Sequence, residues 1–346
     1  MSKKKKTAPE ATDKPSSKGV DSALAEIQKK YGANSITKGN IPPIEKIPTG
    51  LWSIDRATGG GFARRRWNHI FGPKSSGKST VCLLVSKEVQ KMGGTVAYID
   101  AEHSFDPVYA HSLGVDTEKN FYYARPHTIE ESETIIQKLA PLVDLVIVDS
   151  ITAVPGSKEV RGIEKDGLEK DSMMVIPAAL SKFFRFVTPI VGTGKAAILL
   201  VNQTRTNLSG YIAFDDFSGG NALRHANSIS LQIRPAPKAD NPTKEINGKS
   251  VIIGQNNIVK VDKNKTGGSH PGQMVAFNIF FQEPYNRPLS DLVINALTDG
   301  VIERTGSTYS VDGEKIAVGK DNILAALTEN KDLRKKLEKK MGGLIS

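Results

Sequence analysis

Eight residues, Gly72 to Ser79, constrain the fold of this chain more than any other stretch. They read GPKSSGKS, a G-x-x-x-x-G-K-S pattern between an apolar run at 67–71 and a helix-like run at 78–91. A loop of this kind turns successive backbone N–H groups inward around phosphate oxygens, and the helix after it adds its dipole. The pattern predicts a strand, a phosphate-binding loop and a helix in that order. The alternative is a glycine–serine turn with a chance lysine.

The loop residues have distinct chemical roles in such a site. Gly72 and Gly77 permit close backbone approaches that a Cβ would block, and Lys78 can reach the β- and γ-phosphates of a nucleotide. The Ser79 hydroxyl can ligate Mg²⁺. The nucleotide contacts expected from the loop are Gly72, Pro73, Lys74, Ser75, Ser76, Gly77, Lys78, Ser79 and Thr80. We therefore expect ATP and Mg²⁺ as ligands.

Strand-like and helix-like segments alternate from about residue 51 onward. Strand-like runs lie at 67–71, 95–100, 145–150, 196–203, 228–234, 256–263 and 274–281, and helical patterns lie at 78–91, 129–140 and 173–188. Alternation of this kind predicts an α/β fold with a mainly parallel sheet flanked by helices.

Polar residues stand at the ends of several strand-like runs, where open α/β sheets bind ligands. Asp149 can hold Mg²⁺ through water beside the phosphate loop. Hydrolysis of ATP needs a group that positions the attacking water, and Glu102, just past a strand end, is the candidate. Asp100 can instead be a structural carboxylate. Gln203 can sense the γ-phosphate, or can simply be a polar residue that caps a strand.

Composition limits the class of protein. Hydrophobic residues make up 38% of the 346 residues, enough for a core, and no run of 18 apolar residues predicts a transmembrane helix. The basic start lacks the apolar segment of a signal peptide, and the single cysteine, Cys82, fits a reducing, intracellular setting. The net charge is +10, with six basic and two acidic residues in each of the segments 1–19 and 331–346. Basic ends suit a polyanion such as DNA, or are solvated tails.

Local composition divides the chain into four parts. We expect residues 1–19 to be a disordered basic tail and residues 20–50 to be a helix, capped by Asp21, with a linker. The α/β core occupies 51–283, and a small α+β domain at 284–346 is expected to contain one charged helix over 321–341. The run Arg64–Arg66 precedes the first core strand, at a subunit interface or in solvent.

Several segments, taken in order, resemble the RecA family of homologous recombinases. The core segments are GPKSSGKST, YIDAEHSFDPVYAHSLGVD, VIVDS, LLVNQTR, GGNALRHANSISLQIR and KVDKNKTGG. ALAEIQKKYGANSI is similar to the family's amino-terminal helix, and residues 290–322 resemble its carboxyl-terminal domain. The resemblance covers about residues 20–340, and FFRFVTPIVGTGK resembles phage-encoded recombinases of the UvsX type.

The resemblance implies a DNA-dependent ATPase with a RecA-type core. It would form a helical filament on single-stranded DNA and exchange strands with double-stranded DNA in recombination and repair. The implied setting is the cytoplasm of a bacterium or a phage-infected bacterial host, with no membrane and with single-strand-binding and mediator proteins as further partners. The acidic tail common in bacterial members is absent, so regulation by such a tail is not expected.

The resemblance also assigns roles to single residues. Glu102 matches the catalytic glutamate, Gln203 the γ-phosphate sensor, and Asp106 and Tyr109 the residues that hold adenine, Tyr109 by stacking. Lys263 and Lys265 match a pair that reaches the ATP of the neighbouring subunit.

Two segments, 160–172 and 204–218, match the DNA-binding loops of the family. The DNA contacts implied in and around them are Met174, Arg185, Arg205, Tyr211, Phe214, Gly219, Gly220 and Asn221. Arg205 suits a phosphate, whereas Tyr211 and Phe214 suit stacking on bases or packing beneath the loop.

Two other functions stay open on the sequence. A RecA-fold motor such as a ring helicase would keep the phosphate loop and Glu102 without needing the amino-terminal helix and linker. A regulatory filament that uses ATP only as an assembly switch would have no need of Glu102, Lys263 and Lys265.

Overall fold

The structure is a computed structural model. It describes residues 17–33, 35–36, 38–39, 41, 43–150, 152–157, 175–207, 214–217, 220–246, 249–281 and 287–341. The chain divides into two compact units, Met1–Ile44 and Glu45–Ser346.

The first unit contains helix α1 (Ser17–Tyr31). The helix begins three residues earlier than the sequence predicts, so residues 17–19, which we expected to be disordered, are helical. Asp21 therefore lies inside the helix and is not its cap; its carboxylate pairs with Lys38 at 2.8 Å. The helix exposes the apolar side chains of Val20, Ile27 and Tyr31.

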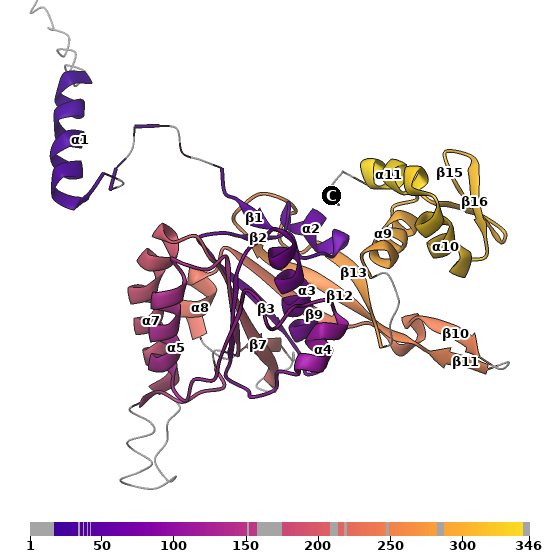
Figure 1. The fold of residues 1–346 in the computed structure, drawn as a ribbon, viewed down its shortest axis with the longest axis horizontal. Coiled ribbons are helices and arrows are strands. Elements are labelled where there is room, and N and C mark those ends of the chain that lie inside the picture. The colour runs from indigo at the N-terminus through magenta and orange to yellow at the C-terminus, as the bar shows by residue number, and fades with distance from the viewer. Residues whose placement is uncertain are drawn as a thin grey trace, which may run out of the picture. The chain divides into compact units, whose positions relative to one another are not determined.

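A nine-stranded sheet organises the second unit (Figure 1). Its strands are β3 (Trp67–Gly72), β4 (Val96–Asp100), β5 (Phe121–Ala124), β6 (Leu145–Asp149), β7 (Ala197–Asn207), β8 (Phe214–Phe217), β9 (Ile229–Pro235), β12 (Gly254–Asn264) and β13 (Met274–Phe280). Their order is β13-β12-β9-β3-β7-β6-β4-β5, with β8 paired to β7. Strands β9, β3, β7, β6, β4 and β5 run parallel, whereas β12 pairs antiparallel with β9 and β13. The predicted α/β fold with a mainly parallel sheet is confirmed.

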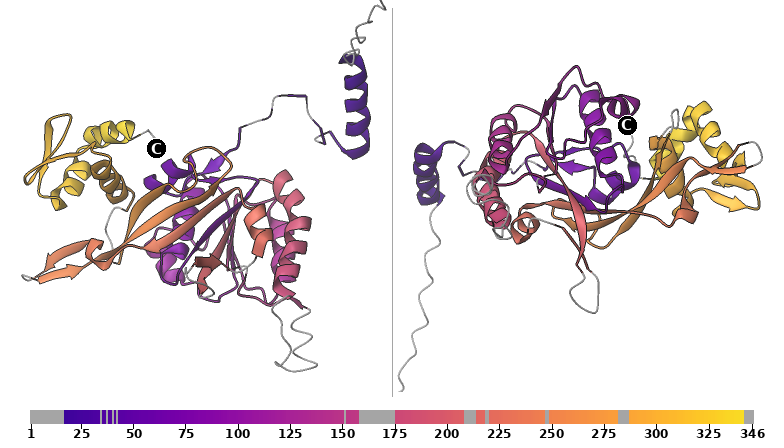
Figure 2. Two further views of the ribbon diagram at one scale, coloured as in Figure 1. Left: turned by 180° about the vertical axis from the view of Figure 1, so that it is seen from behind. Right: turned by 90° about the horizontal axis from the view of Figure 1, so that it is seen from below.

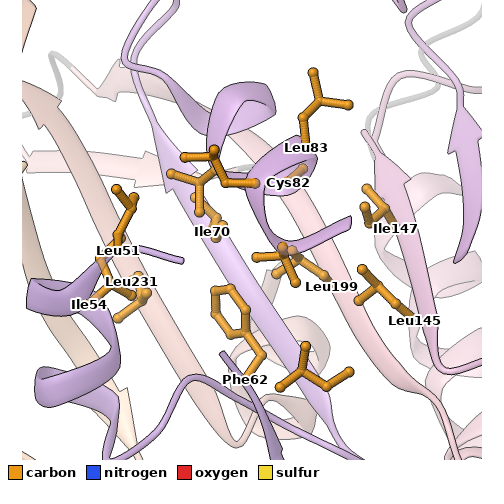
Figure 3. Packing of buried hydrophobic residues seen from close by; sticks show 14 of the residues in the cluster. Leu51, Ile54, Phe62, Ile70, Cys82, Leu83, Leu145, Ile147, Leu199 and Leu231 are labelled. Atoms are coloured by element: carbon orange, nitrogen blue, oxygen red, sulfur yellow. The ribbon is translucent and has the colours of Figure 1, made fainter. Parts of the chain in front are cut away.

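Helices cover both faces of this sheet (Figures 1 and 2). On one face α3 (Lys78–Lys91) packs over a core that includes Ile70, Ile147, Leu199 and Leu231 (Figure 3). On the other face α5 (Ile129–Leu139), α7 (Val175–Thr193) and α8 (Gly220–Ala226) bury a second core around Phe183 and Val187. Because parallel strands buried on both faces are apolar throughout, these runs were readable in the sequence.

Two core elements run past their predicted ends. Helix α7 continues to Thr193 through Pro189, because the buried side chains of Val187 and Val191 continue its apolar stripe. Strand β7 continues to Asn207, where it pairs with β8. The short strands β1 (Lys46–Ile47) and β2 (Phe62–Ala63) and the ribbon of β10 (Thr243–Ile246) and β11 (Lys249–Ile252) were not predicted.

The carboxyl-terminal part of the second unit has its own small core. It contains α9 (Arg287–Thr298), β14 (Glu303–Thr305), β15 (Thr308–Val311), β16 (Glu314–Val318), α10 (Asp321–Glu329) and α11 (Lys331–Lys340). The prediction of one charged helix over 321–341 is wrong, because Asn330 ends α10 and caps α11 by accepting a hydrogen bond from Leu333 N at 3.0 Å. Lys336 and Lys340 pair with Asp312, which offsets part of the positive charge there.

Helix α2 (Trp52–Thr58) connects this small core to the sheet. Trp52 packs in the carboxyl-terminal core, and Ser53 donates two hydrogen bonds to Asp291, from its backbone N at 2.8 Å and its Oγ at 2.9 Å. Burial raises the pKa of Asp291 to about 7. The same cause raises the pKa of Asp55 to about 7, although Thr49 donates hydrogen bonds to it.

Arg64 has a structural role at the edge where the parallel strands begin. Its Nη1 lies 2.9 Å from Oδ1 of Asp144, and Lys195 Nζ lies 3.2 Å from Oδ2 of the same carboxylate. Arg64 is 13% exposed and so is not a solvated side chain, whereas Arg65 in the same run is exposed, and the predicted subunit interface stays a prediction. Among the described residues, no helix is long and apolar enough to cross a membrane.

Candidate ATP and DNA sites

The predicted phosphate loop lies between β3 and α3. Strand β3 ends at Gly72, beside Gln203 of β7, and α3 begins at Lys78. A Cβ on Gly72 would lie 1.9 Å from the carbonyl oxygen of Ile233. Gly77 has a φ of 83°, and a Cβ there would lie 2.2 Å from Ile279 Cδ1. Gly72 is therefore required by the close approach of the β9 backbone, and Gly77 is favoured by its positive φ.

Polar groups of this loop face inward. Lys78 Nζ donates hydrogen bonds to the carbonyls of Gly72 at 3.1 Å and Pro73 at 2.7 Å. Burial lowers the pKa of Lys78, while the negative charges of Asp149 and Glu102 oppose that shift. Ser76 Oγ is buried and has no hydrogen-bond partner among the described residues. A buried hydroxyl without a partner, beside an ammonium, fits a loop that takes phosphate oxygens.

Ser79 and Asp149 form an oxygen pair next to the loop. Ser79 Oγ donates to Asp149 Oδ2 at 2.8 Å, and the hydroxyl of Tyr98 donates to the same oxygen at 2.9 Å. Burial raises the pKa of Asp149, and these two hydrogen bonds oppose it. A hydroxyl and a carboxylate are the hard oxygen donors that Mg²⁺ prefers, so the pair fits this ion. Tyr98 was missed in the sequence, where its only signal was a hydroxyl inside an apolar strand.

The structure brings Glu102 and Gln203 together at the carboxyl ends of the parallel strands. Gln203 Nε2 lies 3.0 Å from Oε1 and 3.1 Å from Oε2 of Glu102. Asp100 serves the fold, since its oxygens accept hydrogen bonds from the backbone N of Ser104 and Phe105 and from the hydroxyl of Tyr123. Of the two acids considered from sequence, Asp100 is therefore the structural carboxylate, and Glu102 stays the candidate for positioning water.

The two residues expected to hold adenine lie beside the start of α3. Asp106 caps α4 (Pro107–Ser112) by accepting hydrogen bonds from Val108 N at 2.8 Å and Tyr109 N at 3.2 Å. The hydroxyl of Tyr109 lies 2.8 Å from Thr80 Oγ1, which joins α4 to the phosphate-loop helix.

Lys263 and Lys265 lie near the end of the sheet at which the parallel strands begin, opposite to the end that carries the phosphate loop. Lys263 of β12 pairs with Ser230, which lies close to the start of β9. Strand β3 runs parallel to β9, and the phosphate loop follows the end of β3. Lys263 and the phosphate loop therefore lie at opposite ends of these strands. Lys263 Nζ donates to the carbonyls of Arg224 and His225 on α8, which covers the face opposite to α3. Burial and the nearby charge of Lys265 lower the pKa of Lys263. The pair is therefore separated from the phosphate loop of its own chain.

The second DNA segment is more ordered than a loop. Residues 204–207 of β7 pair antiparallel with β8, with Arg205 opposite Asp216 and Asn207 opposite Phe214. The prediction of a loop throughout 204–218 is wrong for these eight residues, whose threonines and phenylalanines favour strands. Gly220 and Asn221 open α8. The segment 160–172 and Met174, Tyr211 and Gly219 lie outside the described residues.

Arg185 lies on the exposed face of α7. Its guanidinium carbon is 5.3 Å from the ring centre of Phe186, which is 51% exposed. The structure thus leaves this cation accessible.

Comparison with known proteins agrees with this architecture. Residues 18–286 match the family described as RecA N-terminal domain, and residues 290–345 match RecA C-terminal domain. The chain is 34% identical to Protein RecA of Ehrlichia chaffeensis over 95% of its length and 90% of the relative's. It is also 34% identical to Protein RecA of Bartonella quintana, over 95% of the chain and 94% of the relative, and to that of Prochlorococcus marinus, over 97% and 88%. The chain belongs to the RecA family of homologous recombinases.

Proposed function

We propose that this chain binds ATP with Mg²⁺ at the loop Gly72–Ser79 and hydrolyses it while assembled as a helical filament on single-stranded DNA. The filament pairs that strand with homologous double-stranded DNA and exchanges strands, in recombination and DNA repair. Family membership over nearly the whole chain supports the activity. The observation that supports assembly into a filament is the separation of Lys263 from the phosphate loop of its own chain.

Each residue of the proposed ATP site has a task. Backbone N–H groups of the loop and the Lys78 ammonium bind phosphate oxygens, and Ser79 with Asp149 holds Mg²⁺, which neutralises phosphate charge. Glu102 orients the attacking water and accepts its proton. Asp106 and Tyr109 bind the adenine ring.

Gln203 can transmit the nucleotide state to the DNA segment. It touches Glu102 and lies in β7, two residues before Arg205 in the same strand. A change in the hydrogen bonds of its amide therefore acts on the hairpin that we propose binds DNA. Arg205 and Arg185 contact phosphates, and Phe214 contacts bases. We also keep Met174, Tyr211, Gly219, Gly220 and Asn221 as proposed DNA contacts.

Lys263 and Lys265 complete the site from the neighbouring subunit. Two ammonium groups beside the γ-phosphate stabilise the charge that develops during transfer, as an arginine finger does. Mixing Lys263→Ala/Lys265→Ala protein with Glu102→Gln protein tests this. Either variant alone should hydrolyse ATP far more slowly than the parent, but some interfaces in a mixed filament pair an intact Glu102 with intact lysines. Recovered hydrolysis supports action between subunits, and its absence in filaments shown to be mixed contradicts it.

Two experiments separate this function from the alternatives. Open filaments rather than closed rings under electron microscopy exclude a ring helicase. Joint molecules formed between homologous single- and double-stranded DNA exclude a filament that uses ATP only for assembly.

The cellular setting and the domain division are proposals as well. The bacterial relatives support the cytoplasm of a bacterium, and a phage-encoded origin stays a prediction from the segment 183–195. Single-strand-binding and mediator proteins are proposed further partners. We propose that α1, with its exposed Ile27 and Tyr31, joins neighbouring subunits. An ATPase core at 51–283 and a carboxyl-terminal domain from 284 complete the division.

A further inference from the structure

Helix α8 links two parts of the molecule that DNA-dependent hydrolysis must coordinate. It begins three residues after β8, the second strand of the DNA hairpin. At its other end Lys263 Nζ donates hydrogen bonds to the carbonyls of Arg224 and His225, the second of them at 3.4 Å. The last carbonyls of a helix have no partner within it and carry the negative end of its dipole, so they stabilise an ammonium.

A β-bulge directs Lys263 toward this helix. The register of β12 against β9 shifts between Val261 and Lys263, so that Lys263 lies opposite Ser230. A bulge of this kind bends the strand and re-aims the side chains beside it. Lys265, two residues further, is exposed, and its backbone N donates to Ser228 O at 2.9 Å. Of the two lysines, Lys263 is thus the one that α8 holds.

The side-chain amide of Asn227, the residue after α8, lacks hydrogen-bond partners in this arrangement of the described residues. Asn227 is 1% exposed, and neither Nδ2 nor Oδ1 of its amide has a hydrogen-bond partner within the part of the chain that the structure describes. Buried amides in folded proteins are nearly always paired, because an unpaired one is costly. The unpaired amide follows His225, whose carbonyl accepts from Lys263, by two residues along the chain, so this segment contains a second potential donor for the end of α8.

We propose that the carboxyl end of α8 is a latch for Lys263, released when single-stranded DNA binds the hairpin of β7 and β8. In the latched arrangement the ammonium caps α8 of its own subunit. DNA that displaces α8 frees the ammonium for the ATP of the neighbouring subunit, and the Asn227 amide replaces it at the vacated carbonyls. One ammonium cannot occupy both positions, so hydrolysis depends on DNA. This latch rests on the proposed action of Lys263 between subunits.

Two variants at one position test the latch. His225 is exposed, and both His225→Gly and His225→Ala remove its imidazole while keeping the carbonyl. They differ in helix stability, because glycine is less favourable than alanine by ~1 kcal/mol, about fivefold in an equilibrium constant. We expect His225→Gly to hydrolyse ATP without DNA up to about fivefold faster than His225→Ala. The rates of the two variants on poly(dT) should be equal. In the Lys263→Ala background the DNA-free difference should vanish.

The outcomes are distinct. Equal DNA-free rates for the two variants, or a difference that persists with Lys263→Ala, overturn the latch. If Lys263→Ala hydrolyses ATP normally on DNA, the proposed action of Lys263 between subunits fails, and the latch that rests on it fails as well. Amine acylation followed by peptide mapping gives an independent readout in full-length protein without DNA. Acylation of Lys263 relative to Lys265 should be faster in His225→Gly than in His225→Ala, and an unchanged ratio contradicts release.

Discussion

Gln203 holds both carboxylate oxygens of Glu102 through one amide nitrogen, at 3.0 and 3.1 Å. Glu102 follows β4 and Gln203 lies in β7, with β6 between these strands. The proposed water-positioning group and the strand that leads to the DNA hairpin are therefore in direct contact. A γ-phosphate that attracts the Gln203 amide would therefore act on Glu102 and on strand β7 at the same time.

The first prediction concerns this contact. Gln203→Leu keeps the size of the side chain but removes its donor, so ATP should still bind while its effect on DNA affinity is lost. The affinity for single-stranded DNA, measured with and without ATP, should differ far less in the variant than in the parent. If ATP tightens DNA binding as strongly in both, Gln203 does not transmit the nucleotide state.

Glu102→Gln tests the chemical step. The amide keeps the shape but cannot accept a proton, so hydrolysis should fall by a factor of ~10²–10⁴, the usual contribution of a general base. ATP binding should persist, and the filaments should last longer than those of the parent. Hydrolysis at the parental rate contradicts the role of Glu102.

The phosphate loop offers a matched pair of lysines. Lys78 is 8% exposed and bonded to two loop carbonyls, whereas Lys74 is exposed at the loop's outer side. Lys78→Ala should abolish ATP binding and stable filaments, while Lys74→Ala should weaken ATP binding by less than tenfold. Binding of a fluorescent ATP analogue measures both. Equal losses would mean that the charge, and not the position of Lys78, matters.

Arg205 and Phe214 should affect DNA binding in different ways. Phosphate contacts set the slope of log affinity against log salt, whereas stacking on a base contributes ~1–3 kcal/mol with little salt dependence. Arg205→Ala should lower that slope by up to about one contact. Phe214→Ala should impair strand exchange and DNA-stimulated hydrolysis with the slope unchanged. If Phe214→Ala melts early yet exchanges strands normally at low temperature, the residue only packs in the fold.

The buried carboxyl of Asp291 predicts a pH dependence of stability. Its pKa is about 7 in the folded chain, against ~3.9 in an unfolded one, so the folded state holds the extra proton between these values. The free energy of unfolding should therefore fall as pH rises from about 4 to 7, by at most ~4 kcal/mol for this group. Asp291→Asn should flatten that part of the profile, and Asp299→Asn, on an exposed ion pair, should not. Denaturant unfolding across this pH range is the measurement, and parallel profiles for Asp291→Asn and the parent reject the assignment.

The local site was readable from the sequence, because a phosphate loop is a contiguous pattern. Gly72, Lys78 and Ser79 lie where their spacing predicts, and apolar runs ending in Asp149 and Gln203 marked the strand ends at which open α/β sheets bind ligands. Contacts between distant segments left no comparable pattern. Tyr98 on Asp149, the bulge before Lys263 and the bond from Ser53 to Asp291 all depend on strand pairing or on packing. The break at Asn330 was missed because helical spacing of leucines continued on both sides of it.

Cys82 gives this chain a practical property. Its thiol is fully buried in the core beneath α3, and burial raises its pKa well above the ordinary value, so little thiolate forms near neutral pH. Thiol-directed dyes and spin labels react with thiolate, and Cys82 is the chain's only cysteine. A cysteine introduced at Tyr31 or Lys265 should then be the single position that takes a label, with the native cysteine left in place. Distances between copies in an assembled filament can be read spectroscopically from such labels.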